Sequence, residues 1–307
     1  METRLLRTLV ELNRRGTMRA VAAATGYGTS AISQQLAVLE REMGTALTER
    51  TGRTVRLTWA GRRLAEHAER ILAAEAEARA ALDTGSEPSG VLKIAAFATA
   101  ISVDILPIAR RLAVSHPRLS LEVQEREPAE VVRLLADGEV DLGFGYDYSL
   151  VQRFHDDGGA VRLMCTTPLM LAVPASMPAP GRIASPDDLR AFADAPWVVN
   201  SRGEDDGELV RRMVATAKVA HRADSLGLVL DIVAADFGVA LVPVSAPPRD
   251  GVVYVPMPGL DVHRRMFALT RPGEQGRPAI ALVSELVSAH VGVVGSPLPT
   301  PDEVRPS

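Results

Sequence analysis

Between residues 17 and 43, two helical patterns are separated by a tight turn that contains glycine, and this arrangement restricts the possible folds most strongly. Thr17 is placed to cap a short Ala-rich helix, which Gly26 ends. After the turn, a second helix runs to about Glu42 and directs one apolar face into a core, with Ile32, Leu36, Leu39 and Met43. Together with a preceding helix over 4–14, this order predicts a helix-turn-helix.

The polar face of the helix after the turn has almost no charge. A solvent-exposed helix usually presents charged residues there, whereas small and amide side chains suit the major groove of DNA. Gln34 can pair with adenine through two hydrogen bonds, and Ala37 or the Thr29 methyl group can contact the thymine methyl. An ordinary solvated face is the alternative. We predict DNA contacts from Thr29, Ser30, Ser33, Gln34, Ala37 and Arg41.

Residues 44–61 alternate apolar and polar positions, which predicts a short hairpin that turns at 51–53. The exposed arginines of this hairpin are Arg50, Arg53 and Arg56. Such a wing would contact phosphates or the minor groove, and a hairpin exposed only to water is the alternative. Charge favours DNA: residues 1–70 contain five more arginines than glutamates and no Lys or Asp, so the rest of the chain carries −9 within the total of −4.

These motifs resemble the LysR-type transcriptional regulators. The residues that carry the resemblance are Ser30-Ala31-Ile32-Ser33, Gln35-Leu36, Leu39-Glu40, Gly44, Leu47, Arg50, Val55-Arg56-Leu57-Thr58 and Ala60-Gly61. Members often have Ser at the position of Gly28, Gln at Thr29, an aromatic residue at Thr48 and an acidic residue or Pro at Trp59. These departures leave the base preference at Thr29 open and predict that Trp59 helps to pack the wing near Thr48.

Residues 62–82 predict a long Ala-rich helix without Gly or Pro. Its apolar stripe, interrupted by Glu75, consists of Leu64, Ala68, Ile71, Leu72, Ala78 and Leu82. The stripe suits either a two-helix dimer seam or packing on the chain's own domain. The resemblance implies the seam, and therefore a homodimer that presents two recognition helices to neighbouring half-sites, with a tetramer as the full assembly.

From Val91 the pattern changes to alternating strands and helices, which predicts an α/β architecture. The expected order is strand 91–97, helix 102–115, strand 119–123, helix 130–136 and strand 141–145. In such a parallel sheet, ligands bind beyond the carboxyl ends of the strands. Those ends correspond to the loops 97–102, 125–129 and 146–149.

A second set of elements begins near Val161, and a strand over 264–270 returns to the first set. Two such lobes are similar to periplasmic binding proteins and to LysR-type effector domains, a resemblance carried by Leu92-Lys93-Ile94, Leu106-Pro107, His116-Pro117, Asp141-Leu142 and 238–243. The predicted domains are a winged helix-turn-helix over 1–61, a linker helix over 62–83, a flexible hinge over 84–90, an effector domain over 91–293 and a disordered tail over 294–307. Lobe I comprises about 91–160 and 265–293, and lobe II about 161–264.

The resemblance implies an inducer site between the lobes, near the loop after the first strand. On lobe I this loop supplies Thr99, Ala100 and Ser102, and on lobe II a strand end is followed by Asn200, Ser201 and Arg202. Their hydroxyls, amides and guanidinium would suit a small carboxylate. Ordinary turn chemistry is the alternative for each residue, and Arg202 could instead pair with the acidic stretch 203–208 beside it.

Other functional classes find little support. No run reaches the roughly 18–20 apolar residues of a membrane span, and the sequence contains no GxSxG, HExxH or Gly-rich phosphate motif. We therefore expect no catalysis, cofactor or metal, and we expect Asp147 and Asp156-Asp157 to be surface acids in loops. The single cysteine, Cys165, has no disulfide partner in these residues, fits a reducing cytoplasm and is expected to be buried.

The sequence thus predicts a cytoplasmic, sequence-specific DNA-binding regulator of the LysR type that a small-molecule effector controls. Its expected partners are double-stranded DNA, further copies of the chain, the effector and RNA polymerase. Two alternatives stay open. One is a ligand-binding or interaction module whose N-terminal helices only serve oligomerisation, and the other is a DNA-binding protein without sequence preference.

Overall fold

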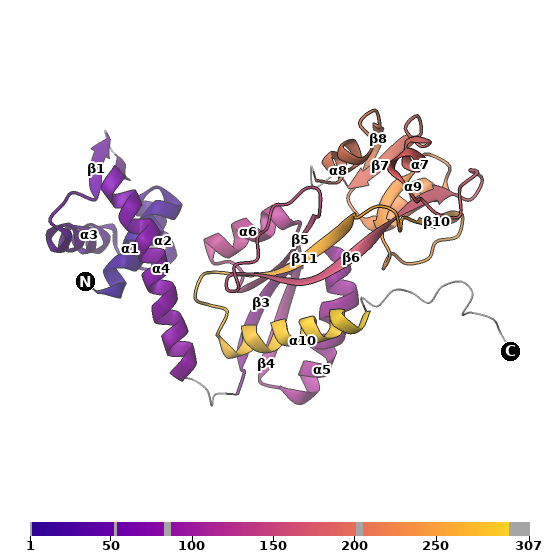
Figure 1. Ribbon diagram of the computed structural model, residues 1–307. Coiled ribbons are helices and arrows are strands. Elements are labelled where there is room, and N and C mark those ends of the chain that lie inside the picture. Colours follow the sequence, from indigo (N-terminus) through magenta and orange to yellow (C-terminus); the bar gives the residue numbers. More distant parts are fainter. Residues whose placement is uncertain (1, 52–53, 83–86, 201–204, 295–307) are drawn as a thin grey trace.

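The computed structural model describes residues 2–51, 54–82, 87–200 and 205–294. A helical head with a small hairpin forms the N-terminal part, one long helix leaves it, and an α/β body contains the rest of the chain (Figure 1). The predicted fold class is confirmed. Within the described residues, no helix combines the length and the apolar character needed to cross a membrane.

The head is a winged helix-turn-helix, as predicted. Its elements are α1 (Thr3–Arg15), α2 (Met18–Thr25), α3 (Thr29–Met43), β1 (Thr48–Thr51) and β2 (Thr54–Leu57). Thr17 caps α2 by accepting a hydrogen bond from the Ala20 N–H. The apolar face of α3 is buried at Ile32, Leu36 and Leu39. Met43 is 36% exposed, so its predicted inward position is wrong, because α3 ends at this residue.

Glu40 of α3 holds the base of the wing. One carboxylate oxygen accepts hydrogen bonds from the Leu47 N–H at 2.9 Å, the Thr48 N–H at 2.8 Å and the Thr48 hydroxyl at 2.9 Å. Trp59 has 72% of its surface exposed, so the prediction that it packs the wing near Thr48 is wrong. A polar contact to α3 replaces the aromatic packing expected there.

The long helix α4 (Trp59–Leu82) packs along α1 of its own head. Ala68 is completely buried there, and Leu64 and Leu72 pack against the same core. This corrects the assignment of Ala68 to a dimer seam, because a side chain without exposed surface cannot contact a second copy. Glu75 pairs with Arg7 of α1 at 3.2 Å. The other predicted seam residues are Ile71 and Ala78, which are exposed, and Leu82, whose side chain lies outside the described part.

Lobe I of the body contains the predicted parallel strands. β3 (Gly90–Ala96) lies between β4 (Leu119–Glu125) and β5 (Leu142–Tyr148). The helices of this lobe are α5 (Leu106–Ser115), α6 (Pro128–Asp137) and α10 (Pro278–Val294). The first part of the helix expected over 102–115 belongs instead to η1 (Ala100–Ile105), a π-helical segment directly after the loop that follows β3.

The long strand β6 (Val161–Pro174) joins the lobes into one seven-stranded sheet of order β10-β6-β11-β5-β3-β4, with β9 beside β6 (Figure 1). Its first half pairs with β11 (His263–Thr270), and its second half pairs with β9 (Ala240–Pro243) and β10 (Val252–Pro256). Lobe II adds α7 (Pro186–Arg190), β7 (Pro196–Asn200), α8 (Asp205–Met213), β8 (Lys218–Ala223) and α9 (Leu226–Ala234). The sequence patterns do not predict β8 and β10, which are short and partly exposed.

Asp147 of β5 is completely buried, which corrects its assignment to a surface loop. Arg265 of β11 donates to both of its carboxylate oxygens at 2.7 Å. The N–H groups of Arg153 and Phe154 donate to the same carboxylate at 2.7 and 2.9 Å. The charge is therefore both paired and hydrogen-bonded, as a buried carboxylate requires, and the ion pair ties β5 to β11.

Candidate functional site

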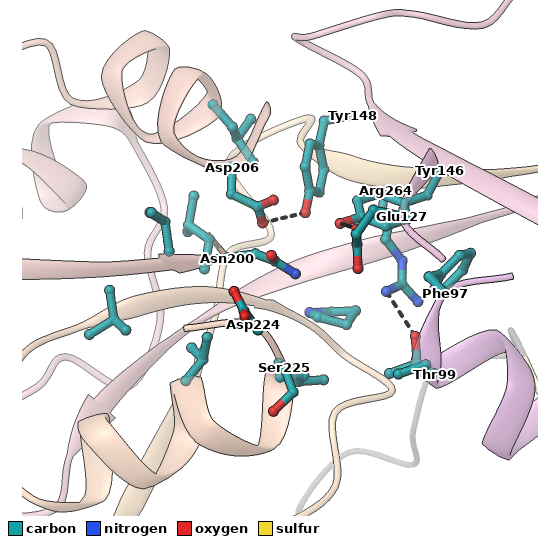
Figure 2. A pocket seen from close by; sticks show the side chains of 18 of the residues that line it. Phe97, Thr99, Glu127, Tyr146, Tyr148, Asn200, Asp206, Asp224, Ser225 and Arg264 are labelled. Atoms are coloured by element: carbon teal, nitrogen blue, oxygen red, sulfur yellow. Dashed lines mark hydrogen bonds between the residues drawn. The ribbon is translucent and has the colours of Figure 1, made fainter. Parts of the chain in front are cut away.

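A cavity lies between the two lobes, beyond the carboxyl ends of β3 and β5 (Figure 2). The loop after β3, the end of β5 and the start of β11 form one side, and β7, α8 and α9 form the other. Its volume is about 70 Å³. Since a water molecule needs at least ~10–15 Å³ by this measure, the cavity has room for roughly five waters. Only a very small ligand fits while the lobes are in this arrangement.

Arg264 of β11 is the cation on the lobe I side. Its guanidinium lies over the rings of Phe97 and Tyr146, at 5.1 and 5.7 Å from their centroids. Nη1 donates to the Thr99 hydroxyl oxygen at 3.3 Å. Within the described part of the chain it forms no ion pair with a carboxylate. The two rings thus orient a guanidinium whose remaining N–H groups face the cavity (Figure 2).

Two carboxylates accept hydrogen bonds from tyrosines at the end of β5. The Tyr148 hydroxyl donates to Asp206 Oδ1 at 2.7 Å, and the Tyr146 hydroxyl donates to Glu127 at 3.0 Å. The other oxygen of Asp206, Oδ2, is buried and has no hydrogen-bond partner among the described residues. Burial raises the pKa of Asp206 to about 6 and raises the pKa of both tyrosines well above 10.0.

Several side-chain contacts connect α8 of lobe II to lobe I. The Tyr148–Asp206 hydrogen bond links β5 to α8, and Arg153 pairs with Asp205 in the same first turn of α8. At the other end of α8, Arg212 donates to the Leu150 carbonyl at 2.7 Å. α8 is therefore bonded to lobe I at both of its ends. Loss of the Asp206 hydrogen bond would remove one of the contacts that hold the two lobes in this arrangement.

Only some of the predicted effector-binding residues lie at the cavity. Thr99 and Asn200 line the cavity. Ala100 is 1% exposed and belongs to the core. The Ser102 hydroxyl donates to the carbonyls of Ala98 and Thr99. The prediction that Ala100 and Ser102 contact the effector is therefore wrong, because η1 turns both side chains away from the cavity. Two further predicted residues, Ser201 and Arg202, lie outside the described residues.

Several residues that line the cavity were not predicted individually. They are Phe97, Glu127, Tyr146, Tyr148, Asp206, Asp224, Ser225 and Arg264. The first four lie in the loops or strand ends where the parallel-sheet rule expects a ligand. Asp206 lies in the acidic stretch that was considered only as a partner for Arg202. For Arg264 no local signal exists, since its place depends on the return of β11 to lobe I.

Two family models match this sequence. Residues 3–62 match the bacterial regulatory helix-turn-helix protein, lysR family, and residues 85–292 match the LysR substrate binding domain. The chain belongs to the LysR family. It is a LysR-type transcriptional regulator, with a helix-turn-helix DNA-binding domain followed by an effector-binding domain. Regulators of this family bind DNA and small-molecule effectors and form oligomers.

Individual relatives extend over nearly the whole regulator. A "Probable hydrogen peroxide-inducible genes activator" of Mycobacterium avium is 26% identical over 300 residues, which cover 93% of this chain and 94% of the relative. A "Probable cat1 operon transcriptional activator" of Acinetobacter lwoffii is 27% identical and covers 80% of this chain and 82% of its own length. A full-length OxyR variant of Pseudomonas aeruginosa has the same fold, with a TM-score of 0.63, 20% identity and coverage of 94% and 98%.

The described residues among the predicted DNA-binding residues of this LysR-type regulator are exposed on α3 and the wing. On α3 the exposed residues are Thr29, Ser30, Ser33, Gln34, Ala37 and Arg41. Arg50 and Arg56 are exposed on β1 and β2, and Arg53 lies outside the described residues. Gln35, one position further along α3, is buried and accepts a hydrogen bond from the Thr8 hydroxyl, which fixes the rotation of α3 about its axis.

Lowering the pH from 7 to 5 should stabilise the effector domain through Asp206. Its pKa is raised from 3.8 to about 6 by burial, so below pH 6 the folded chain binds a proton that the unfolded chain does not. At 1.36 kcal/mol per pH unit, the free energy of unfolding should gain about 1 kcal/mol from this group. Urea unfolding of the wild type and of Asp206→Asn at both pH values measures the difference. The same pH dependence in both proteins would contradict the assignment.

Proposed function

We propose that this LysR-type regulator recognises its operator with the outer face of α3 and holds the flanking DNA backbone with the wing. The observation that carries the proposal is the division of α3 into a buried apolar face and an exposed face of small and amide side chains. A helix of this kind suits the major groove. Arg50 and Arg56, exposed on the adjacent hairpin, suit phosphates or the minor groove.

The effector would bind in the cavity between the lobes. Thr99 and Asn200 line it together with Asp206 and Arg264, so the donors and acceptors come from separate elements. A ligand that contacts both sides would favour one arrangement of the lobes over others, by its difference in affinity for them. The interlobe contacts of α8 through Tyr148 and Arg212 are the elements that such a shift would change.

The regulator would act in the cytoplasm as a dimer through α4, and as a tetramer in its full assembly. Ile71 and Ala78, exposed on α4, are the candidate contacts, and family members oligomerise. Two heads would then meet neighbouring half-sites about one DNA turn apart. A change in the lobes would alter the spacing of the heads and the bend of the DNA, and so the access of RNA polymerase.

Several relatives are named as activators of hydrogen peroxide-inducible genes, but the cysteine content of this chain argues against peroxide sensing through a disulfide. The 307 residues contain one cysteine, Cys165, so no disulfide can form within them. This thiol is half-buried, and burial raises its pKa. A raised pKa lowers the fraction of reactive thiolate at neutral pH.

Binding to the DNA upstream of the regulator's own gene, compared with random DNA of equal length over a range of salt, tests the proposed function. Specific recognition should give tighter binding to the upstream DNA, typically by a factor of ~10³ or more at physiological salt. Equal affinities would exclude specific regulation and favour a DNA-binding protein without sequence preference. The absence of binding to either DNA would favour a ligand-binding or interaction module.

Replacing Ser33 or Gln34 with alanine should relax base preference at single operator positions. Each loss should amount to about 1–3 kcal/mol for the preferred base, with little change for random DNA. Competition binding against operators with single base changes measures it. Gln152→Ala, which removes an exposed amide on lobe I, is the matched control and should bind like the wild type. A uniform loss over all sequences would place these side chains against the backbone.

A further inference from the structure

Arg264 is a partly buried cation in the lining of the cavity between the lobes. A guanidinium carries several N–H donors, and the hydrogen bond to the Thr99 hydroxyl oxygen, at 3.3 Å, uses a single one of them. Asp104 and Asp206 attract it electrostatically, but no ion pair joins it to a carboxylate in the described part of the chain. Its nitrogens without a bond are not buried, so they can donate to a ligand.

Two aromatic rings fix the position of this guanidinium. Its central carbon lies 5.1 Å from the centroid of the Phe97 ring and 5.7 Å from that of the Tyr146 ring. Aromatic faces stabilise a cation without using its N–H groups, which therefore stay available at the edge of the guanidinium. Figure 2 shows both rings and Thr99 around Arg264 on the lobe I side of the cavity. The donors are thus oriented before a ligand binds, which lowers the cost of binding.

The carboxylates of the same lining are bound to other groups. The Tyr148 hydroxyl donates to Asp206 at 2.7 Å, and the Tyr146 hydroxyl donates to Glu127 at 3.0 Å. Glu127 has a further partner, and Asp224 also has one. Among the described residues of the lining, Arg264 is the one cation. It is therefore the group that can recognise a negative charge on a ligand.

The remaining wall and the size of the cavity define the rest of the ligand. Lobe II contributes a group of apolar side chains from β7, α8 and α9, namely Val198, Val199, Leu209, Val210, Leu226 and Val229. Such side chains favour a hydrocarbon group. The volume is about 70 Å³, so room for roughly five waters corresponds to a ligand of about four to six non-hydrogen atoms. An aromatic acid is too large for the cavity in this arrangement of the lobes.

We propose that the cavity binds a short-chain aliphatic monocarboxylate, of the size of acetate, propionate or butyrate. The carboxylate accepts two parallel hydrogen bonds from N–H groups of Arg264 that Thr99 does not use, and the Thr99 hydroxyl donates a third. The alkyl chain packs on the apolar side chains of lobe II, so the ligand contacts both lobes. This rests on the proposed function in one respect, that the cavity between the lobes is the effector site.

Calorimetric titration of the full chain with acetate, propionate and butyrate, at constant ionic strength, tests the proposal. Propionamide is the matched probe, because it has the shape of propionate without its charge. Benzoate tests the size limit, and inorganic phosphate tests whether any anion suffices. At least one short carboxylate should bind, and propionamide, benzoate and phosphate should each bind at least tenfold more weakly than the best of the three. A smaller difference for any of these probes, or no binding of the three carboxylates, would overturn the proposal.

Variants of Arg264 locate the carboxylate. Arg264→Gln should lower the affinity for the best carboxylate at least tenfold. Arg264→Lys keeps the charge but cannot donate two parallel hydrogen bonds, so its affinity should fall between those of Arg264→Gln and the wild type. Arg190→Gln removes an exposed arginine of α7 and is the matched control, which should bind like the wild type. Thermal unfolding without ligand establishes that each variant is folded. Unchanged affinity in a folded Arg264→Gln or Arg264→Lys would place the carboxylate elsewhere and overturn the assignment.

The outcome can be separated from that of the proposed function. If the regulator distinguishes its upstream DNA from random DNA but binds none of the three carboxylates, only the ligand assignment fails. If it binds a carboxylate but both DNAs equally, the ligand assignment stands and the regulatory function fails. Repeating the DNA titration at a saturating concentration of the best carboxylate should change the apparent affinity for upstream DNA, while Arg264→Gln should show no such change.

Discussion

Replacing Arg265 with leucine should lower the free energy of unfolding of the effector domain by about 3–5 kcal/mol. Arg265 donates to both oxygens of Asp147 at 2.7 Å, and Asp147 has no exposed surface. Without the guanidinium, the two backbone N–H groups that also bind this carboxylate would be its remaining partners. A buried charge without a counter-ion costs several times more than the loss of an exposed ion pair.

Urea unfolding of the full chain, followed by circular dichroism, measures this effect. Arg190→Leu is the control, because the Arg190–Asp187 pair is largely exposed on both sides and should contribute less than about 1 kcal/mol. Adding Asp147→Asn to Arg265→Leu should recover part of the stability, since the unpaired charge is then removed. A loss below 1 kcal/mol in Arg265→Leu would show that water or a neighbouring group compensates the charge.

The head could be predicted from the sequence because its determinants are local. Thr17 and Gly26 mark the ends of α2, and the spacing of Ile32, Leu36 and Leu39 defines the buried face of α3. The error at Trp59 has a different origin. Whether an aromatic residue packs on the wing depends on Glu40, which reaches the backbone of the wing from α3, and helical periodicity does not report such a contact.

The body was predicted less completely, because its decisive contacts are not local. Strand alternation identified β3, β4 and β5, but pairing of β6 with strands of both lobes depends on register over nearly a hundred residues. The same dependence explains Asp147, which looks like a loop acid until β11 brings Arg265 beside it. Partly exposed strands such as β8 lack the apolar runs that identify buried strands.

The candidate effector site shows the same limit. Thr99 was expected from the family resemblance and Asn200 from its place after a strand end, and both line the cavity. Ala100 and Ser102 were assigned with them because the π-helical turn of η1, which directs them elsewhere, leaves no mark in the residue pattern. Arg264 and Asp206 lie far apart in the sequence, and only the assembled lobes bring them to the same cavity.

Replacing Gly61 with alanine should disrupt the wing and lower the affinity for operator DNA at least tenfold. A Cβ at this position would lie 2.1 Å from the Leu47 carbonyl oxygen and 3.0 Å from its carbon. That oxygen accepts the Thr58 N–H at 2.9 Å, and the Thr58 hydroxyl in turn accepts the Gly61 N–H at 3.0 Å. The start of α4 and the base of the wing are thus joined by backbone contacts that cannot move independently.

Helix propensity alone predicts that Gly61→Ala stabilises the chain, since alanine in a helix is about 1 kcal/mol more favourable than glycine. The clash should prevail, because it involves main-chain atoms of Leu47 and not the end of a flexible side chain, and overpacking of this kind costs about 1–3 kcal/mol. DNA binding and thermal unfolding of Gly61→Ala measure both consequences. Gly181→Ala is the matched control, because a Cβ there meets no atom within 4 Å. If Gly61→Ala were more stable than the wild type and bound DNA with unchanged affinity, helix propensity would outweigh the clash with Leu47. In that case α4 would be free to shift away from the wing.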